Sequence, residues 1–289
     1  MSATHLLIVD PQNDFCDLPD GWRPIDPVAG TALAPALPVP GAHADMLRLA
    51  ELIDGAGAAI DAITVTLDTH RRLDIAHTPF WRRRAGGEPV EVAPFTEITL
   101  AQIDAGAFVP ADPANFERAR RYVERLEARG RYRLMAWPVH CEEGTWGHNV
   151  HAAVRAAYAR WEDAHGRNAE KVVKGQNTWT EHYSAIQAEV PDDADPRTTL
   201  NRTLLERLDG ATEIVVAGEA SSHCVAATVR DLVAHLPSGG PQRLTLLADC
   251  MSPVQGCAAL QASFFDDLRR AGARLATAGE WRASRSARG

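Results

Sequence analysis

Short apolar runs and longer helix-like segments alternate along most of the chain. The runs typical of strands occupy residues 6–9, 59–67, 133–136, 171–173, 214–217 and 244–248. The patterns typical of helices occupy residues 40–56, 145–163, 199–208, 224–235 and 257–270. Strands that are each followed by a helix indicate crossover units between parallel strands. The pattern therefore predicts a three-layer α/β/α fold with a mostly parallel central sheet.

Two stretches interrupt this alternation. Residues 19–40 are rich in Pro, Gly and Ala, which predicts a long surface loop between the first strand and the first helix. Residues 82–131 form an apparent insertion that carries a predicted helix over residues 113–129, with Asp112 as its cap. The alternating charges of that helix are typical of a solvated face. We expect residues 1–289 to form a single domain with this insertion.

Composition narrows the classes of partner. The chain has 289 residues, 45% of them hydrophobic, and a net charge of −8. Such a charge provides no basic field for DNA or RNA, so we expect a small-molecule partner and no nucleic acid. No apolar run approaches the roughly 20 residues that span a bilayer, so we expect no membrane association.

The cysteines and one helix suggest where the protein works and how it assembles. The five cysteines, at positions 16, 141, 224, 250 and 257, show neither a disulfide framework nor paired Cys-x-x-Cys zinc motifs. Reduced thiols fit a cytoplasmic protein, and the chain starts without a signal-peptide pattern. We also expect a homo-oligomer, in which a helix such as residues 225–235 packs between subunits.

Cys224 is the first candidate for chemistry, because ligands of parallel α/β sheets bind just beyond the carboxyl ends of strands. It lies in Gly218-Glu-Ala-Ser-Ser-His-Cys-Val225, between the apolar run 214–217 and the helical pattern that follows. Unpaired backbone N–H groups at the start of a helix lower the pKa of a thiol and favour the thiolate. This position is typical of a nucleophile. The alternative is a buried cysteine that only packs.

Asp10 and Lys174 occupy comparable positions. Asp10 follows Leu7-Ile-Val at the end of the first strand, where desolvation raises the pKa of a carboxyl toward the range of a general base. Lys174 ends the run 171–173, where its ammonium group could stabilise a thiolate. Taken singly, an aspartate at a strand end more often caps a turn, and a lysine there is more often a surface residue.

A carboxylate and three imidazoles also follow predicted strands. Asp68 and His70 are two residues apart on an extended chain and so point to the same side, His77 follows seven residues later, and His140 follows the run 133–136. Such a set suits a divalent metal ion. The alternative for each histidine is an ordinary surface residue. A zinc site at Cys141 is disfavoured, because no second cysteine accompanies it.

Asp10, Lys174 and Cys224 together resemble the catalytic triad of the nicotinamidase group of the isochorismatase-like cysteine hydrolases. The resemblance extends over most of the chain, in six segments that keep the family's order. These are Val9-Asp-Pro-Gln-Asn-Asp-Phe-Cys16, Leu37-Pro-Val-Pro-Gly41, Asp68-Thr-His70, Trp137-Pro-Val-His-Cys141 with Gly144-Thr145, Lys174-Gly175 with Tyr183-Ser-Ala185, and Cys224-Val225.

The resemblance implies a metal ion, zinc with iron or manganese as alternatives. Its implied ligands are Asp68, His70, His77 and His140. The spacing from His70 to His77 is one residue longer than the commonest nicotinamidase pattern, which makes His77 the ligand that departs most from the family. Three of the four ligands should still suffice to hold the ion.

The resemblance also implies a binding surface for the substrate. Phe15 and Trp137 correspond to the aromatic pair that holds a flat ring. A cis peptide bond is implied at Ala220-Ser221, with the backbone amides of Ser221 and Cys224 as the oxyanion hole.

The implied activity is that of a metal-containing cysteine amidohydrolase. It would convert nicotinamide, or a related heteroaromatic or small carboxamide, into the carboxylic acid and ammonia through a thioester. One alternative is a metal-independent hydrolase of another small C–N bond, in a carbamoyl or ureido compound. A second is a non-enzymatic ligand-binding or redox-sensing protein in which Cys224 is oxidised. A dinucleotide site is disfavoured, because no Gly-x-Gly-x-x-Gly follows the first strand.

Overall fold

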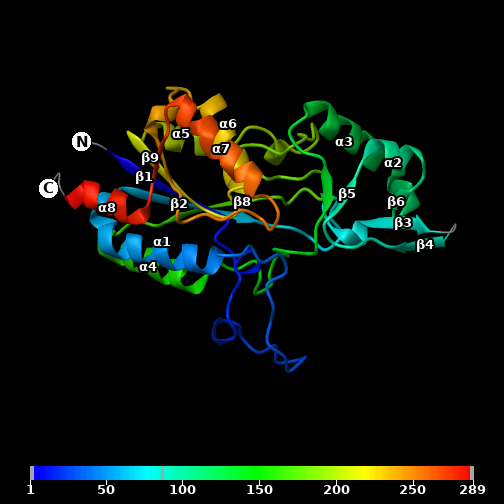
Figure 1. The fold of residues 1–289 in the computed structure, drawn as a ribbon, viewed down its shortest axis with the longest axis horizontal. Coiled ribbons are helices and arrows are strands. Elements are labelled where there is room, and N and C mark those ends of the chain that lie inside the picture. Colours follow the sequence, from blue (N-terminus) through cyan, green and yellow to red (C-terminus); the bar gives the residue numbers. More distant parts are fainter. Residues whose placement is uncertain (1–2, 86–87, 287–289) are drawn as a thin grey trace.

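The computed structural model describes residues 3–85 and 88–286, and a six-stranded parallel sheet forms its centre (Figure 1). In sheet order the strands are β11 (Arg274–Ala276), β10 (Leu244–Leu247), β9 (Glu213–Gly218), β1 (Thr4–Val9), β2 (Ala62–Asp68) and β8 (Glu170–Lys174). All six residues of β1 are buried, as expected for a strand covered on both faces. The predicted parallel sheet is confirmed.

Helices cover both faces of this sheet (Figure 1). One face carries α1 (Ala42–Ala56), α4 (Ala152–His165) and α8 (Ala278–Ser286), and α1 packs against the other two. The opposite face carries α5 (Arg202–Asp209), α6 (Cys224–His235) and α7 (Ala258–Ala271). The three-layer α/β/α prediction is therefore confirmed. The α4 helix begins at Ala152 rather than near residue 145, because the preceding residues form turns whose carbonyls bond the chain after β1.

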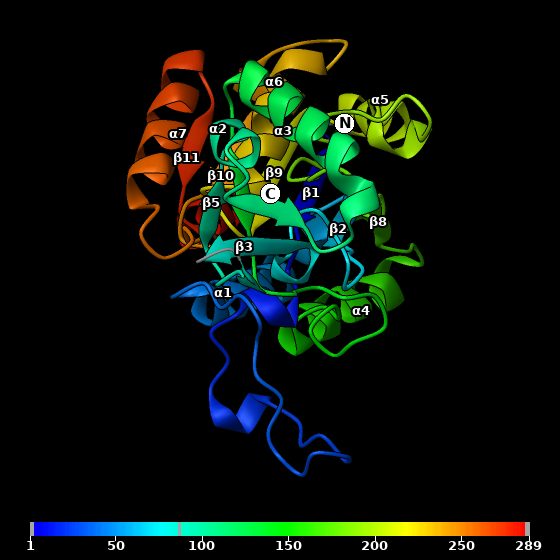
Figure 2. The ribbon, with the colours of Figure 1, turned by 90° about the vertical axis from the view of Figure 1, so that its right-hand side faces the viewer.

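The described part of residues 82–131, the segment that we interpret as an insertion, lies beside the carboxyl end of the sheet and contains more structure than its one predicted helix (Figures 1 and 2). Its elements are β3 (Trp81–Ala85), β4 (Glu88–Glu91), β5 (Thr96–Ile98), α2 (Leu100–Asp104), β6 (Phe108–Pro110) and α3 (Phe116–Arg129). The predicted helix is confirmed as a 3-10 turn at Pro113–Asn115 followed by α3, and the Asp112 side chain accepts from the Ala114 amide. These elements enclose a second cluster of buried apolar side chains.

One predicted strand belongs to a different sheet. Residues 133–136 contain β7 (Leu134–Ala136), which we expected in the central sheet, but β7 pairs antiparallel with β5. The physical reason is that β5 offers a partner before the chain returns from the insertion to the central sheet. The segment after β7 still arrives at the carboxyl end of the sheet, where it carries His140.

The loop over residues 19–40 projects away from the body of the molecule (Figure 2). It contains a 3-10 turn at Asp20–Trp22, and the side chains of Ile25 and Val28 are exposed. The prediction of a long surface loop is confirmed. No helix among the described residues is both long and apolar enough to cross a membrane.

The strand order creates a crevice at the carboxyl end of the sheet. The chain runs from β1 through β2 to β8 at one edge, and then returns to β9 on the other side of β1. Where the connections from two neighbouring strands run in opposite directions, a crevice forms between the two connections. Parallel sheets bind ligands in this crevice. In register, Val9 pairs with Gly218, and Asp68 pairs with Lys174. Residues at or just after these four strand ends therefore meet at one place.

Gly218 allows β9 to approach β1 at this crevice. Its φ is 119°, and a Cβ atom built on it would lie 1.9 Å from the Val9 carbonyl oxygen. Only glycine fits such a contact.

Candidate active site

Lys174 places its ammonium group at the centre of a buried cluster. Its Nζ lies 2.9 Å from Asp10 Oδ2, and it donates to Asp68 Oδ1 at 2.8 Å and to the His182 carbonyl at 2.9 Å. Cys224 Sγ lies 3.7 Å from the same Nζ. Burial opposes the charged form of Lys174, but Asp10 and Asp68 together raise its pKa well above the usual value. The structure thus brings Asp10, Lys174 and Cys224 together around one fixed positive charge.

Asp10 follows β1 in an unusual backbone conformation, with a φ of 44° and no solvent exposure. Its amide donates to Thr66 Oγ1 at 3.0 Å, and the Thr66 hydroxyl donates back to Asp10 Oδ1. Burial raises the pKa of the Asp10 carboxyl, the Asp68 charge raises it further, and Lys174 opposes both. Non-glycine residues in this part of backbone space concentrate at functional sites. The result is a carboxyl whose position and basicity suit proton transfer.

Cys224 is the first residue of α6 and is 5% exposed. Burial raises the pKa of its thiol well above the usual value, Lys174 lowers it, and the carboxylates of Asp10 and Asp68 raise it again. Our expectation that the helix start would depress this pKa is therefore wrong for the free protein. Burial and the neighbouring carboxylates outweigh the effect of Lys174 on this pKa. The thiol needs a base to take its proton during attack.

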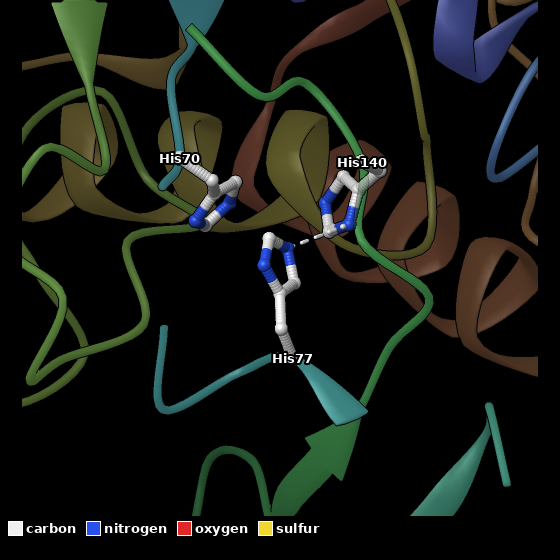
Figure 3. Close-up of side chains that lie close together, drawn as sticks. All are labelled: His70, His77 and His140. Atoms are coloured by element: carbon white, nitrogen blue, oxygen red, sulfur yellow. Dashed lines mark hydrogen bonds between the residues drawn. The ribbon is translucent and has the colours of Figure 1, made fainter. Parts of the chain in front are cut away.

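Three buried histidines lie beside this cluster (Figure 3). His70, His77 and His140 each offer a ring nitrogen, and these atoms all lie within 4.8 Å of one another. Asp68 Oδ2 lies 3.1 Å from His70 Nε2 and 3.5 Å from His140 Nε2. The four predicted ligands are thus brought together. Asp68 belongs to both groups, because its other oxygen accepts from Lys174.

Carbonyl and carboxylate oxygens orient the three histidine rings. The His77 Nδ1 lies 3.1 Å from the Arg71 carbonyl, which can only accept, so Nδ1 carries the proton. His77 Nε2 is then an acceptor, and it lies 3.2 Å from His140 Nδ1 (Figure 3). Burial lowers the pKa of His77 to about 2, and the neighbouring His70 and His140 lower it too. His70 Nδ1 lies 3.2 Å from Asp74 Oδ2, a carboxylate behind a ligand ring. Three imidazoles and a carboxylate of this kind fit zinc or another transition metal ion.

Aromatic rings pack against His140 and against His223, the residue that precedes Cys224. Phe15 lies 5.5 Å from the His140 ring, and Trp137 lies 5.4 Å from the His223 ring, measured between centroids. The Trp137 indole N–H donates to the Tyr183 hydroxyl at 3.0 Å. Phe15 and Trp137, the residues predicted to hold a flat ring, are both buried. They come from different parts of the chain, because Phe15 lies in the segment after β1 and Trp137 directly follows β7.

Several solved structures share this arrangement of elements. The yeast nicotinamidase Pnc1p bound to the inhibitor nicotinaldehyde matches with a TM-score of 0.60 and 19% sequence identity, over 95% of this chain and 99% of that one. A pyrazinamidase of Pyrococcus horikoshii in complex with zinc matches with a TM-score of 0.53 and 17% identity, over 95% and 98%. An isochorismatase family protein from Desulfovibrio vulgaris matches with a TM-score of 0.54 and 17% identity, over 99% and 100%.

The chain has the isochorismatase-like fold. No protein-family model matches the sequence, and no curated protein matches it. The resemblance inferred from the sequence motifs is therefore confirmed at the level of the fold, which the structural matches establish across nearly the whole chain.

One feature implied by the family resemblance lies elsewhere in this isochorismatase-like fold. The cis peptide bond joins Glu219 to Ala220, not Ala220 to Ser221. The Ser221 amide donates to the Ser252 carbonyl at 2.9 Å, so it is not free to bind an oxyanion. The prediction for Ser221 is wrong for that reason. Among the described residues the backbone amides of Ala220 and Cys224 have no hydrogen-bond acceptor, and they take its place as the candidate donors.

Sequence reasoning missed two supporting residues of the candidate site. Thr66 bonds Asp10 and Asp74 bonds His70. A signal existed for Thr66, because Thr64, Thr66 and Asp68 alternate along β2 and share one face. No comparable signal pointed to Asp74, which follows the strand in a turn.

Proposed function

We propose that this protein is a metal-containing cysteine amidohydrolase that converts nicotinamide, or a related heteroaromatic or small carboxamide, into its acid and ammonia. The observation that carries the proposal is the single buried ammonium group of Lys174, which contacts Asp10, Asp68 and Cys224 together. Two of the structural neighbours are a nicotinamidase and a pyrazinamidase, which supports an amide substrate.

The first half of the reaction follows from the position of each group. Asp10 takes the proton of the Cys224 thiol as the sulfur attacks the carboxamide carbon. The amides of Ala220 and Cys224 donate to the oxyanion that develops on the carbonyl oxygen. When the C–N bond breaks, protonated Asp10 returns its proton to the departing nitrogen. Ammonia leaves, and a thioester to Cys224 remains.

The second half releases the acid. Asp10 takes a proton from a water molecule, whose oxygen attacks the thioester carbon, and the sulfur leaves as the thiol after it regains that proton. Lys174 keeps a positive charge beside the acid and the sulfur in both halves, which stabilises negative charge on either one. Asp68, His70, His77 and His140 would hold the metal ion, which supplies a Lewis acid that orients a ring nitrogen of the substrate.

Ammonia release tests the proposal directly. We expect purified protein to release ammonia from nicotinamide or pyrazinamide, and Cys224→Ala to release none above background. Cys257→Ala is the matched control, because Cys257 is a free cysteine only partly buried at the start of α7. Intact-mass measurement after rapid quenching should show an acyl adduct on Cys224. Equal ammonia release by wild type and Cys224→Ala would exclude this nucleophile.

A further inference from the structure

Glu219 is a buried carboxyl one residue before the Ala220 amide, which is a candidate oxyanion donor. It directly follows β9 and has no solvent exposure. Its backbone amide donates to the Val9 carbonyl at 2.8 Å, and its Oε2 accepts from the Ser252 amide at 3.1 Å. Its Oε1 is also buried and accepts from no donor among the described residues. A carboxyl in such a place calls for a specific explanation.

Ser252 holds the backbone on both sides of Ala220. Its amide bonds the Glu219 carboxyl, and its carbonyl accepts from the Ser221 amide at 2.9 Å. Its hydroxyl donates to Asp45 Oδ2 at 2.5 Å, and Asp45 belongs to α1. Ala220 thus has a neighbour on each side that bonds one and the same residue. The α1 helix holds that residue in turn.

The carboxyl groups of Glu219 and Asp45 affect each other's ionisation. Burial raises the pKa of Glu219 well above its usual value, and the charges of Asp45 and Asp17 raise it further. Burial also raises the pKa of Asp45, and a hydrogen bond with Glu219 is among the contacts that oppose this shift. Two neighbouring carboxyls in a dry environment do not both ionise. Asp45 also pairs with Arg48, so Asp45 carries the charge and Glu219 keeps the proton.

The backbone of Glu219 sets the direction of the Ala220 N–H. That N–H belongs to the planar peptide group that begins at the Glu219 carbonyl carbon, so the two move together. An oxyanion donor works only when its N–H points at the place where the negative oxygen forms. Whatever fixes the Glu219 side chain therefore also restricts this donor.

We propose that Glu219 is a positioning residue, whose protonated side chain, held between Ser252 and Asp45, keeps the Ala220 amide directed at the oxyanion. Its carbonyl oxygen accepts from the Ser252 amide, and its O–H donates to the Asp45 carboxylate. A bond to an ionised acceptor is stronger than one between neutral groups. The inference rests on the proposed function, and it deepens that function by naming the groups that keep the oxyanion hole in place.

The test compares three substitutions of Glu219 by steady-state ammonia release. Glu219→Gln keeps a donor for Asp45 and an acceptor for Ser252, so its kcat should stay within about 2-fold of wild type. Glu219→Leu keeps a similar volume but neither bond, and Glu219→Asp is too short to reach both partners. For these two we expect kcat to fall about 10- to 100-fold with KM changed less than about 3-fold, because the oxyanion forms only during the reaction.

Alkylation of Cys224 by iodoacetamide separates positioning of the amide from damage to the nucleophile. The sulfur loses its proton, forms a bond to carbon and displaces iodide, and no oxyanion develops. The three variants should therefore react within about 2-fold of wild type. Glu189→Leu is the matched control, because Glu189 is another buried carboxyl and lies outside the loop 219–224. It should leave kcat and the alkylation rate within about 2-fold of wild type.

The outcomes separate the two proposals. A wild-type kcat for Glu219→Leu and Glu219→Asp would overturn the positioning role. Equal losses of kcat and alkylation rate would also overturn it, because they would show a displaced nucleophile. A loss in Glu219→Gln as large as in Glu219→Asp would exclude the two bonds as the cause, and this pair keeps the test valid if Glu219→Leu does not fold. If wild type and Cys224→Ala release the same ammonia from every carboxamide, the proposed function fails instead.

Discussion

The site has two halves that differ in how the fold builds them. The nucleophile half consists of Asp10, Lys174 and Cys224, each at or just beyond the end of a central strand. The histidine half consists of His70, His77 and His140, of which only His70 follows a central strand closely. Asp68 joins the halves, because one of its oxygens accepts from Lys174 and the other faces two histidines.

This difference separates two tasks. A parallel sheet fixes the ends of its strands firmly, which suits groups that exchange a proton over short distances. Loops change conformation more easily, which suits side chains that must arrange themselves around a metal ion. We therefore expect substitutions in the nucleophile half to affect the chemical step, and substitutions in the histidine half to affect metal retention and substrate binding.

The largest effect on activity is expected for Asp10→Asn. The amide cannot take the thiol proton or return it to the leaving nitrogen, so kcat should fall about 10⁴-fold, at the upper end for general acid-base groups. The measurement is steady-state ammonia release. Asp26→Asn, on the projecting loop, should retain wild-type activity. Retention of more than a tenth of wild-type kcat by Asp10→Asn would contradict the assignment of Asp10 as the base.

Lys174→Gln should reduce kcat about 10³-fold, because developing negative charge on Asp10 and Cys224 loses the ammonium group that contacts both. It should also lower Tm, since the carboxylates of Asp10 and Asp68 remain buried without a cation. Thermal melts and ammonia release measure both effects. Lys171→Gln is the matched control on the same strand, where Lys171 bonds the Ala169 carbonyl at the partly exposed edge. A Lys174→Gln variant as active as Lys171→Gln would remove the lysine from the mechanism.

His77→Ala tests the histidine half separately. We expect metal affinity to fall about 10- to 100-fold, because one ligand nitrogen is lost. Elemental analysis after dialysis against graded chelator concentrations measures it. The rate at which iodoacetamide alkylates Cys224 should stay within about 2-fold of wild type, because no contact to Lys174 changes. Full activity of the metal-free wild type would instead favour the metal-independent alternative for a carbamoyl or ureido substrate.

The smallest effect on activity is expected at Glu189, a buried carboxyl outside both halves. Burial raises its pKa to about 7, although Arg131 opposes the shift. The folded protein then keeps the Glu189 proton up to a higher pH than the unfolded chain does. The contribution of Glu189 to the free energy of unfolding therefore falls as pH rises between about 4.5 and 7. Glu189→Gln should remove about 2 kcal/mol of that decline, as measured by denaturant unfolding across the window. An unchanged slope would show that Glu189 is ionised in the folded protein.

The sequence predicted the nucleophile half better than its surroundings. Asp10, Lys174 and Cys224 were found because apolar runs mark strand ends, and parallel strand ends converge. The strands of the insertion were missed because β4 and β6 are short and β3 carries three consecutive arginines. None of these three strands shows the apolar pattern of a buried strand. The direction of the Cys224 pKa shift was also missed. It depends on burial and on carboxylates distant in sequence, which no local pattern displays.

The residues around the nucleophile illustrate a further limit. The amide of Ser221 was assigned to the oxyanion hole by position alone, and its acceptor at Ser252 lies more than thirty residues away in the sequence. Likewise, Arg131 bonds Asp231 of α6, which lies 100 residues further along the chain. Contacts of this kind are decided by how separate segments pack, so a motif can indicate the site without specifying which of its atoms are free.

The close contact at Gly218 has a mechanical consequence. A methyl group added at Gly218 would force β9 away from β1, since it would collide with the Val9 carbonyl. Asp10 directly follows β1, and a short loop connects β9 to Cys224, the first residue of α6. Gly218→Ala would thus displace the Asp10 carboxyl from the Cys224 sulfur, although neither group would change chemically. The absence of a side chain at Gly218 therefore allows these two groups to lie close together.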